Sequence, residues 1–579
     1  MAWFPVLLVA APLLLAGTFV AQTVFGLARN YASARTIGVP IRFIPISPLN
    51  PFWTLVDRAV LSFIRRLPGP LGRNSFTRYN WRGWEVADRY RSHQEMGDIW
   101  VLVTPFKNWI YLNDPDALNS LFRRGNDFPR PVFVTGVCCW LENVLELTQD
   151  FPFAAILDVF GPNISTAEGQ AWKTQRKMAM HSFNEQNNEI VWSESLTLAT
   201  DMQKYWTSMP SIDTAASDLR TLSLHVLSRA GFGKSFKFES QEDRKTQRPS
   251  ANSAANYKDS LQTIMENCVL ILGLGTSFIA QPWLPKKLRD VHAAYVSFRA
   301  YMTSLYEEEK AAYAVGETGE PNLMRSMVRA SQADAKDGGG LTEAEIYGNM
   351  FVFNFAGHDT TAHSFTFAMY FLAANPEVQE WLHEEIHRVF GDVPVEDWDY
   401  RANFPRLKRC LSVLYETIRL YVPVPTIKWT ADKAQPLVVG GRTLVLPASS
   451  MIAPSYGSVQ TDPRFWGPNS LNWDPSRFIV KSAEDGDEEL RVPVRGSFHG
   501  WSDGARDCPG RKFSHVEFVA TMAVLFRSNW RVKPAPKYPD ESPEAARSRV
   551  LDLIENDSGS VLLLQMLHPE RAPLVWEKR

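Results

Sequence analysis

The sequence predicts a mainly α-helical domain with a small β region, preceded by one apolar helix at the N-terminus. Helical hydrophobic patterns fill most of residues 168–313 and 342–374. Alternating β-branched and aromatic residues are confined to short stretches within 99–113 and 436–457. Because strand and helix patterns do not alternate along the chain, nothing suggests a doubly wound α/β sheet.

The composition is that of an ordinary globular protein. Of the 579 residues, 45% are hydrophobic and 21% are charged, which excludes a coiled coil or a largely disordered chain. Lys and Arg total 61 and Asp and Glu total 63, so the net charge of −2 argues against a nucleic-acid partner. Five cysteines are too few, and odd in number, for a disulfide scaffold.

The N-terminus carries the pattern of a membrane anchor. Residues 1–28 contain no Asp, Glu, Lys or Arg, and the apolar run is long enough to cross a hydrocarbon core of roughly 30 Å. A cleaved signal peptide is disfavoured, because no basic residue precedes the run and the run is longer than such peptides usually are. Residues 29–73 carry seven Arg and one acid, Asp57, so the positive-inside rule predicts that the following chain is cytosolic.

These patterns divide the chain into three parts. They are a transmembrane anchor (1–28), a basic, Pro-rich juxtamembrane hinge (29–75) and one large domain (76–579).

Local signals place the elements of the large domain in order. Thr342 and Glu345 form a capping box that starts a helix running to residue 374, where Asn375-Pro376 ends it. The other expected elements are strands within 99–113, helices within 168–313 around a polar loop at 240–256, helices at 376–390 and 407–421, short strands within 436–457 with a Gly440-Gly441 turn, an acidic loop at 481–490 and a helix at 511–528.

Cys508 is the first candidate site residue. It lies between Gly504 and Gly510, directly before the helix predicted at 511–528. The positive end of that helix and the nearby Arg506 favour a thiolate, which is a suitable ligand for iron. A buried structural cysteine is the alternative, and Cys508 alone does not decide between the two.

The middle of the helix predicted at 342–374 is unusual. Ala356 and Gly357 are small, and Asp359 and Thr360 are polar, within an otherwise apolar helix. The small residues leave room for a group beside the backbone, and the acid and hydroxyl could pass protons to it. The alternative is a helix kink with hydroxyls bonded to the preceding turn.

Two further patterns are weak when taken alone. Trp172 and Arg176 stand one helical turn apart and offer only hydrogen-bond donors, as a carboxylate-binding pair would. Glu416 and Arg419 share a helix face, and Arg477 downstream could complete a buried network of one carboxylate and two guanidinium groups.

Together and in this order, these patterns resemble the cytochrome P450 family of haem-thiolate monooxygenases. WKTQR at 172–176 is similar to the family's helix C, and AGHDTT at 356–361 to its oxygen-activating helix I. ETIR at 416–419 with WDPSRF at 473–478 resembles the ExxR and PERF elements, and WSDGARDCPG at 501–510 resembles the haem-binding loop. The resemblance covers roughly residues 76–564 and implies the cytochrome P450 fold.

The resemblance implies a role for each candidate. Cys508 would be the axial thiolate on the iron of a non-covalently bound haem b, and Arg506, Trp172 and Arg176 would hold the haem propionates. Asp359 and Thr360 would be the catalytic residues that deliver protons. Glu416, Arg419 and Arg477 would support the Cys loop without acting in catalysis.

The sequence departs from the family pattern at three places. Trp501 stands where Phe is usual, and Ser476 replaces the Glu of PERF. Trp429 occupies the place of a propionate-binding Arg, with Lys428 beside it, and the sequence leaves open whether Lys428 substitutes.

A rival motif indicates a different enzyme class. His383, Glu384 and His387 match H-E-x-x-H, in which two His on one helix face bind zinc and the Glu acts as base. The apolar stripe of this helix lies elsewhere, and Val393 stands where an extended motif needs its third His. A zinc hydrolase is therefore the weakest reading.

We expect a monooxygenase that inserts one oxygen atom of O2 into a lipophilic small molecule, in specialised-metabolite biosynthesis of a fungal type. The resemblance implies electron supply by NADPH–cytochrome P450 reductase, contact with membrane lipid, and an endoplasmic-reticulum membrane location with the catalytic domain in the cytosol. A haem-thiolate isomerase or dehydratase without oxygenation is the alternative. The identity of the substrate, the site of oxidation, the number of oxidation steps and the pathway stay open.

Overall fold

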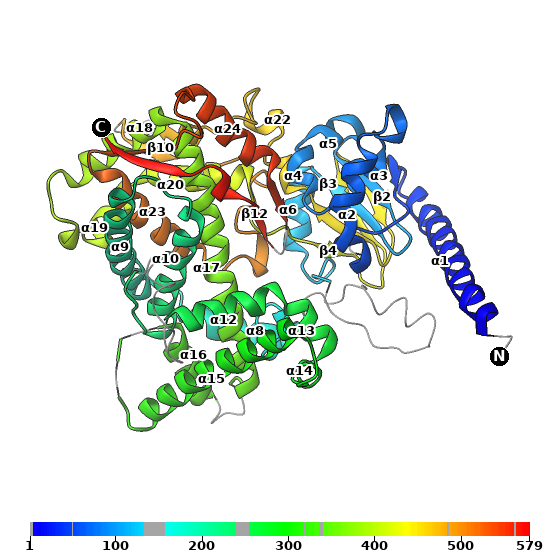
Figure 1. Ribbon diagram of the computed structural model, residues 1–579, viewed down its shortest axis with the longest axis horizontal. Coiled ribbons are helices and arrows are strands. Elements are labelled where there is room, and N and C mark those ends of the chain that lie inside the picture. Colours follow the sequence, from blue (N-terminus) through cyan, green and yellow to red (C-terminus); the bar gives the residue numbers. More distant parts are fainter. Residues whose placement is uncertain are drawn as a thin grey trace. The chain divides into compact units, whose positions relative to one another are not determined.

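A β-rich unit and a larger helical unit share the chain (Figure 1). The computed structural model describes residues 4–48, 50–131, 157–238, 254–317, 319–320, 322–334, 340–482, 486–560 and 563–579. The first unit comprises residues 1–153, 424–472 and 493–507, and the second comprises 154–423, 473–492 and 508–579. The prediction of a mainly α-helical protein with a small β region is confirmed.

The first unit is built on a five-stranded sheet in the order β1-β2-β3-β7-β4. Strands β2 and β3 form an antiparallel hairpin, whereas β1 pairs with β2 and β7 with β3 in parallel. Every residue of β2 and β3 is buried, which explains their nearly continuous apolar sequence. The strands are β1 (Ile41–Phe43), β2 (Ile99–Val103), β3 (Asn108–Leu112), β4 (Lys428–Trp429) and β7 (Met451–Pro454).

A separate hairpin, the long helix α1 and several shorter helices complete this unit. Strands β5 (Gln435–Val439) and β6 (Arg442–Leu446) are joined by Gly440 and Gly441, whose φ angles of +55° and +75° are those of a two-residue hairpin turn. The helices are α1 (Phe4–Arg35), α2 (Pro51–Ile64), α3 (Ser75–Tyr79), α4 (Trp84–Asp88), α5 (Arg91–Met96), α6 (Pro115–Arg123), α21 (Tyr456–Val459) and α22 (Pro463–Trp466), with 3-10 turns η1 (Gly69–Leu71) and η7 (Gly504–Arg506).

The predicted transmembrane span over residues 1–28 is not found. Among the residues that the structure describes, no helix combines the length and the apolar character needed to cross a bilayer. The last turns of α1 instead pack on the sheet: the Asn30 side chain donates to the carbonyl of Thr104 at 2.9 Å, and Ala34 is fully buried in the core. Segment 29–75, expected to be a hinge, contributes β1 and α2 to the first unit.

The second unit is a helical assembly around α17 (Glu343–Ala374), which Figure 1 shows running through it with α10 alongside. The remaining helices are α8 (Gly169–Met180), α9 (Glu185–Ser208), α10 (Ala215–Phe232), α12 (Ala254–Glu266), α13 (Cys268–Leu274), α14 (Thr276–Ile279), α15 (Lys286–Ala314), α16 (Leu323–Asp334), α18 (Pro376–Phe390), α19 (Tyr400–Asn403), α20 (Lys408–Leu420), α23 (Arg511–Arg527) and α24 (Pro543–Asn556), with 3-10 turns η4 (Val395–Asp397), η5 (Phe404–Arg406), η6 (Pro475–Phe478) and η8 (Pro569–Arg571).

Helix α17 has the predicted start and an almost wholly buried surface. Thr342 and Glu345 cap its N-terminus reciprocally, and the helix ends before Asn375. Gly348 allows a close approach, because a Cβ there would lie 2.2 Å from the carbonyl oxygen of Gly161. Burial on all sides explains why the sequence of this helix shows little amphipathic patterning.

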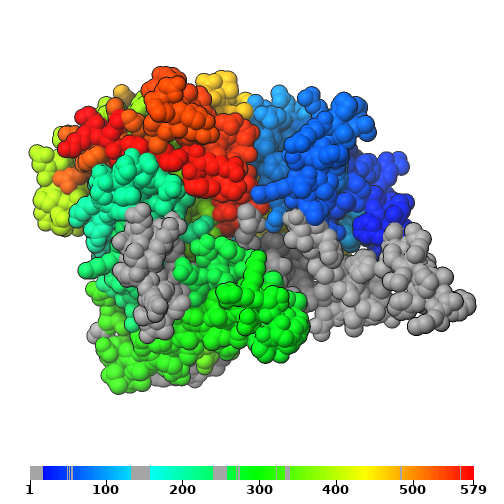
Figure 2. All heavy atoms as spheres, in the orientation of Figure 1, coloured from blue at the N-terminus to red at the C-terminus, as the bar shows by residue number. Residues whose placement is uncertain are grey.

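Three two-stranded antiparallel sheets belong to the second unit. They pair β8 (Ile479–Lys481) with β9 (Glu488–Leu490), β10 (Trp530–Pro534) with β13 (Leu574–Lys578), and β11 (Ser558–Ser560) with β12 (Leu564–Met566). Figure 2 shows the C-terminal segment, in red, on the surface beside the segment around residue 200. Trp576 of β13 stacks on Trp206 of α9, with the ring centroids 5.9 Å apart.

The prediction of an acidic loop over residues 481–490 is partly wrong. Its ends form the β8–β9 hairpin, and both carboxylate oxygens of Glu488 accept hydrogen bonds from Arg409 of α20, at 2.7 and 2.8 Å. The sequence concealed this because the partner of Glu488 lies 79 residues away.

Candidate active site

Cys508 lies at the entrance to a buried helix. Its side chain is exposed, and α23 begins three residues later at Arg511, with Gly510 as the N-cap. Gly510 lies directly beside the sulfur, since a Cβ there would make ordinary van der Waals contacts with the Cys508 sulfur at 3.9 Å and with the Phe183 ring at 3.8 Å. The thiol is therefore accessible at the positive end of a helix, as a metal-binding thiolate requires.

One small part of the surface of α17 is not fully buried. It is formed by Ala356, Gly357 and Thr360 and is named the open patch. Ala356 is exposed and Gly357 and Thr360 are half-buried, although most of the residues around them on the helix are buried. The Thr360 hydroxyl donates to the carbonyl of Ala356 at 2.7 Å. This is the back-bonded hydroxyl that a kink would show, and it also holds the Thr360 side chain at the open patch.

Asp359 is buried beside this patch and is held by two partners. Arg220 of α10 donates through Nε to Oδ1 of Asp359 at 2.8 Å, and His363 Nε2 lies 3.5 Å from Oδ2. Burial alone would raise the pKa of Asp359, but the imidazole of His363 and the charge of Arg220 hold the pKa well below its usual range. Asp359 is therefore a carboxylate across the physiological range of pH.

Arg220 was not predicted from the sequence. It lies 139 residues before Asp359 and on a different helix, and no motif marks it. His363 stands one turn after Asp359 on α17, so its i+4 spacing was the one signal that could have identified a partner.

Trp172 and Arg176 lie together on α8, as predicted. Both side chains are half-buried and stand one turn apart. Gln175 between them donates through Nε2 to Glu345 of α17 at 3.1 Å and accepts a hydrogen bond from Asn349 at 3.0 Å. These bonds fix the rotation of α8 about its axis and hence the direction of the two donor side chains.

Arg506 belongs to the first unit, where it ends the 3-10 turn η7. Its carbonyl accepts a hydrogen bond from Nη2 of Arg130 at 3.0 Å. Gly504, at φ +75°, lets this turn approach α6, since a Cβ there would lie 2.4 Å from the carbonyl oxygen of Phe122. The close packing holds the backbone of Arg506 in one position.

The predicted network around Glu416 is present in the second unit. Glu416 and Arg419 are fully buried and form a bidentate pair, with both N–O distances at 2.7 Å. Arg477 Nε lies 3.4 Å from Glu416 Oε1, and the backbone N–H of Asp474 donates to the same oxygen at 2.9 Å. The pair thus ties α20 to the turn η6.

The H-E-x-x-H residues are engaged elsewhere. A ring nitrogen of His383 bonds the carbonyl of Phe526 at 3.1 Å, and Glu384 accepts from Arg409 at 3.0 Å. Across the described residues, no group of three or more His, Cys, Asp and Glu side chains is arranged to hold a metal ion. The geometry gives the zinc-hydrolase alternative no third ligand.

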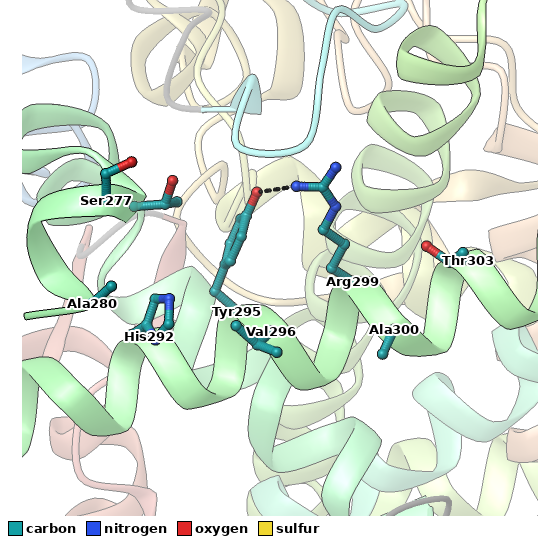
Figure 3. Close-up of a pocket in the computed structure, with 9 residues that line it drawn as sticks. Ser277, Ala280, His292, Tyr295, Val296, Arg299, Ala300 and Thr303 are labelled. Atoms are coloured by element: carbon teal, nitrogen blue, oxygen red, sulfur yellow. Dashed lines mark hydrogen bonds between the residues drawn. The ribbon is translucent and has the colours of Figure 1, made fainter.

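A surface cavity of about 690 Å³ lies between α14 and α15 (Figure 3). Figure 3 shows Tyr295 and Arg299 rising from α15, with Arg299 donating to the Tyr295 hydroxyl at 3.5 Å. None of the predicted site residues lines this cavity. Phe353 of α17 is buried edge-on against Phe183, at a centroid distance of 6.0 Å.

The residues present fit a haem. The donor set includes an accessible thiol at a helix N-terminus and the paired donors Trp172 and Arg176. Thiolate sulfur is a preferred ligand of haem iron, and guanidinium and indole N–H groups are donors suited to carboxylates.

Comparison with known proteins agrees with this reading. The family model "Cytochrome P450" matches residues 142–553. A cytochrome P450 monooxygenase of Arthrobotrys oligospora is 26% identical, with 88% of this chain and 89% of that protein covered. The cytochrome P450 monooxygenase of the phomenoic acid biosynthesis cluster of Leptosphaeria maculans is also 26% identical, with coverage of 94% and 96%.

A solved structure shows the same fold. The crystal structure of a cytochrome P450 aligns with a TM-score of 0.62 at 18% identity, and the alignment covers 85% of this chain and 97% of that one. The predicted cytochrome P450 fold is thereby confirmed, and so is haem as the cofactor. The chain belongs to the cytochrome P450 family and is a haem-thiolate monooxygenase.

Proposed function

We propose that the protein inserts one oxygen atom of O2 into a lipophilic small molecule of specialised metabolism. The proposal rests on the open patch of α17, where the Thr360 hydroxyl lies beside the buried, ionised Asp359. One relative supports the metabolic context, because it is named for the phomenoic acid biosynthesis cluster of Leptosphaeria maculans.

The mechanism assigns each side chain a task. Cys508 would hold the iron through its sulfur, and Trp172, Arg176 and Arg506 would bind the two propionates. When bound, the haem supplies the activation of O2. Ala356 is small and exposed and leaves space beside the α17 backbone, whereas Gly357 packs against Leu227 of α10, because a Cβ there would lie 3.0 Å from the Leu227 side chain. The Thr360 hydroxyl, which donates to the Ala356 carbonyl, would turn to donate into that space, and the Asp359 carboxylate, anchored by Arg220, would accept a proton from solvent and pass it on to the hydroxyl.

In the alternative, the protein binds haem but transfers no oxygen to its substrate, as an isomerase or dehydratase would. An acid and a hydroxyl placed to move protons favour the oxygenase, because an isomerisation without O2 reduction has no net demand for protons from solvent.

We propose electron supply by NADPH–cytochrome P450 reductase, since the family uses external redox partners and α23 presents Arg511 and Lys512 to solvent.

One experiment separates the two reactions. The purified protein is incubated with the reductase, NADPH, a panel of lipophilic candidates and ¹⁸O2, and products are analysed by mass spectrometry. A monooxygenase yields a product that carries one ¹⁸O atom and requires NADPH. A product that forms at the same rate without NADPH and carries no ¹⁸O would establish the alternative.

The reductase contact has its own test. Lys512 is exposed and its ammonium lies 4.2 Å from the centre of the Phe404 ring, so it can be replaced without opening the core. We expect Lys512→Gln to slow reduction of the haem by the reductase and to leave the haem spectrum unchanged. Lys204→Gln, at an exposed lysine of α9, is the control. Equal reduction rates for both variants would contradict the proposed contact.

We also propose location at the endoplasmic-reticulum membrane, with the catalytic domain facing the cytosol. The support is the apolar sequence of residues 1–28 and the exposed apolar side chains of α1 and α2, namely Phe19, Val20, Val24, Phe25, Val56 and Phe63. Fractionation of cells that express the full chain tests this. Recovery in the microsomal pellet supports the proposal, and recovery in the supernatant contradicts it.

A further inference from the structure

His363 of α17 differs in its contacts from three other buried histidines. Those three bond a backbone carbonyl through a ring nitrogen, as a structural imidazole does, and they are His93, His358 and His499. The polar contacts of His363 are instead with two charged side chains. Its Nε2 lies 3.5 Å from Oδ2 of Asp359 and 3.5 Å from Nη2 of Arg220. This position suits an imidazole that changes its protonation state.

The two contacts of Nε2 require different protonation states of His363. A neutral imidazole with its proton on Nδ1 offers the Nε2 lone pair, to which Arg220 can donate. A protonated imidazole carries a second proton on Nε2 and can donate it to the carboxylate of Asp359. The side chain of His363 is 8% exposed, so part of the ring contacts solvent. The imidazole can therefore take a proton from solvent and present it to Asp359.

We propose that His363 is a positioning residue that acts through Asp359: it hands a proton to the carboxylate and thereby releases the carboxyl group toward Thr360. This inference deepens the proposed function and rests on it. It names the immediate source of the protons that reach the open patch, and no motif in the sequence indicated that source.

Asp359 needs a donor in contact because it takes protons from water poorly. Insertion of one oxygen atom of O2, with release of the other as water, consumes two protons for each molecule of product. Although burial raises the pKa of Asp359, His363 and Arg220 hold that pKa well below its usual range. A proton from bulk water therefore rarely resides on this carboxylate near pH 7. A protonated imidazole beside Oδ2 supplies the proton without an encounter with free acid.

The transfer also weakens the hold of Arg220 on Asp359. The N–H bond at Nε2 of His363 breaks, and an O–H bond forms at Oδ2 of Asp359. Two opposite charges become two neutral groups, which lowers the cost of their burial. Arg220 then faces a neutral carboxyl group across the 2.8 Å contact with Oδ1, and a hydrogen bond to a neutral acceptor is weaker than one to a carboxylate. The carboxyl group can turn toward Thr360, and His363 regains its proton from solvent.

Other ionisable groups around His363 come from three helices. On α17, burial lowers the pKa of His358 to about 4, and burial raises the pKa of Tyr370 far above neutral pH. On α10, the guanidinium of Arg220 stays positive. Glu517 of α23 faces α10, and burial raises its pKa to about 8. Because Glu517 is present in every protein that is compared, its titration does not distinguish them.

The first measurement needs no turnover. Urea unfolding of the wild type, His363→Gln, Asp359→Asn and the double variant gives the coupling free energy between the two side chains. A protonated imidazole attracts a carboxylate more strongly than a neutral one, so the coupling should be larger at pH 6 than at pH 8. Equal coupling at the two pH values would overturn the inference.

The second measurement is the amount of ¹⁸O-labelled product per NADPH consumed, with the compound that forms product in the ¹⁸O2 panel. The amide of His363→Gln keeps a donor for Asp359 but does not titrate. We expect about tenfold less product per NADPH for this variant at pH 7. The yield of the wild type should fall from pH 6 to pH 8, and that of the variant should not. His568→Gln, which removes an exposed imidazole 3.2 Å from Glu570, is the matched control and should behave as the wild type does.

The outcomes separate this inference from the proposed function. If His363→Gln gives the yield and the pH profile of the wild type, the inference is wrong and the proposed function stands. If the wild type incorporates no ¹⁸O, the proposed function fails and the inference fails with it. If circular dichroism shows that His363→Gln is misfolded, His363→Asn, which also keeps an amide donor, takes its place with the same expectations.

Discussion

Arg220 and Asp359 form an ion pair between α10 and α17, with Nε and Oδ1 2.8 Å apart, next to the open patch of α17. The Asp359 side chain is 8% exposed and that of Arg220 is 25% exposed. The guanidinium thus extends from solvent to a buried carboxylate. It connects the surface with the place where the mechanism needs protons, and it keeps that carboxylate ionised.

Replacement of Arg220 should impair proton supply. In Arg220→Met, burial acts on Asp359 with one less opposing charge, so the pKa of Asp359 rises and its carboxylate is no longer anchored. We expect turnover to fall by about ten- to a hundredfold, with more NADPH consumed per molecule of product. The measurement is the ratio of product to NADPH as a function of pH.

The control for Arg220 is Arg229→Met on the same helix, which removes a guanidinium paired with the exposed Glu320. Unchanged coupling of NADPH to product in Arg220→Met, or equal loss in both variants, would refute the role of the Arg220–Asp359 pair.

Glu517 should make stability fall as pH rises. Its carboxyl is fully buried on α23, and burial raises its pKa from 4.5 to about 8. Between pH 4.5 and 8 the folded state therefore binds a proton that the unfolded state has lost, so the free energy of unfolding decreases with pH, by at most about 1.4 kcal/mol per pH unit. Urea unfolding across this range measures the slope.

In Glu517→Gln this contribution to the slope should vanish, because the amide does not titrate. Glu544→Gln, at an exposed glutamate of α24, should keep the wild-type slope. Identical slopes in wild type and Glu517→Gln would show that Glu517 is ionised in the folded protein.

The Glu416–Arg419 pair should stabilise the folded protein. Both side chains are fully buried, so Glu416→Ala leaves an uncompensated guanidinium in the core and should lower the free energy of unfolding by about 3–5 kcal/mol. Asp290→Ala breaks the exposed pair with Lys286 and should cost at most about 1 kcal/mol. Chemical denaturation compares the two, and equal stability of both variants would rule out a structural role for Glu416.

Local signals in the sequence predicted the elements that carry the site. The Thr342–Glu345 capping box gave the start of α17, Asn375-Pro376 its end, and Gly440-Gly441 the turn between β5 and β6. Cap and turn residues act within a few positions of one another, so a single sequence contains the whole signal. The motifs around Cys508 and Glu416 could likewise be recognised from the sequence, because family motifs are continuous in sequence.

Partners brought together by packing could not be predicted. Arg220 meets Asp359 across 139 residues, and Arg130 meets Arg506 across 376. The direction of Lys428 depends on the register of β4 against β7, and a shift of one residue would exchange it with Trp429. The apolar run at residues 1–28 indicated a membrane span that the described residues do not show, because composition alone does not tell where a helix packs.

The central claim is that the Cys508 sulfur is the axial ligand of the haem iron, and the reduced, CO-bound difference spectrum tests it most directly. The wild type and Cys410→Ala, which alters a buried cysteine of α20, should show the red-shifted Soret band of thiolate ligation. Cys508→Ser should lack that band. Persistence of the thiolate band in Cys508→Ser, or an imidazole-type spectrum in the wild type, would contradict the account.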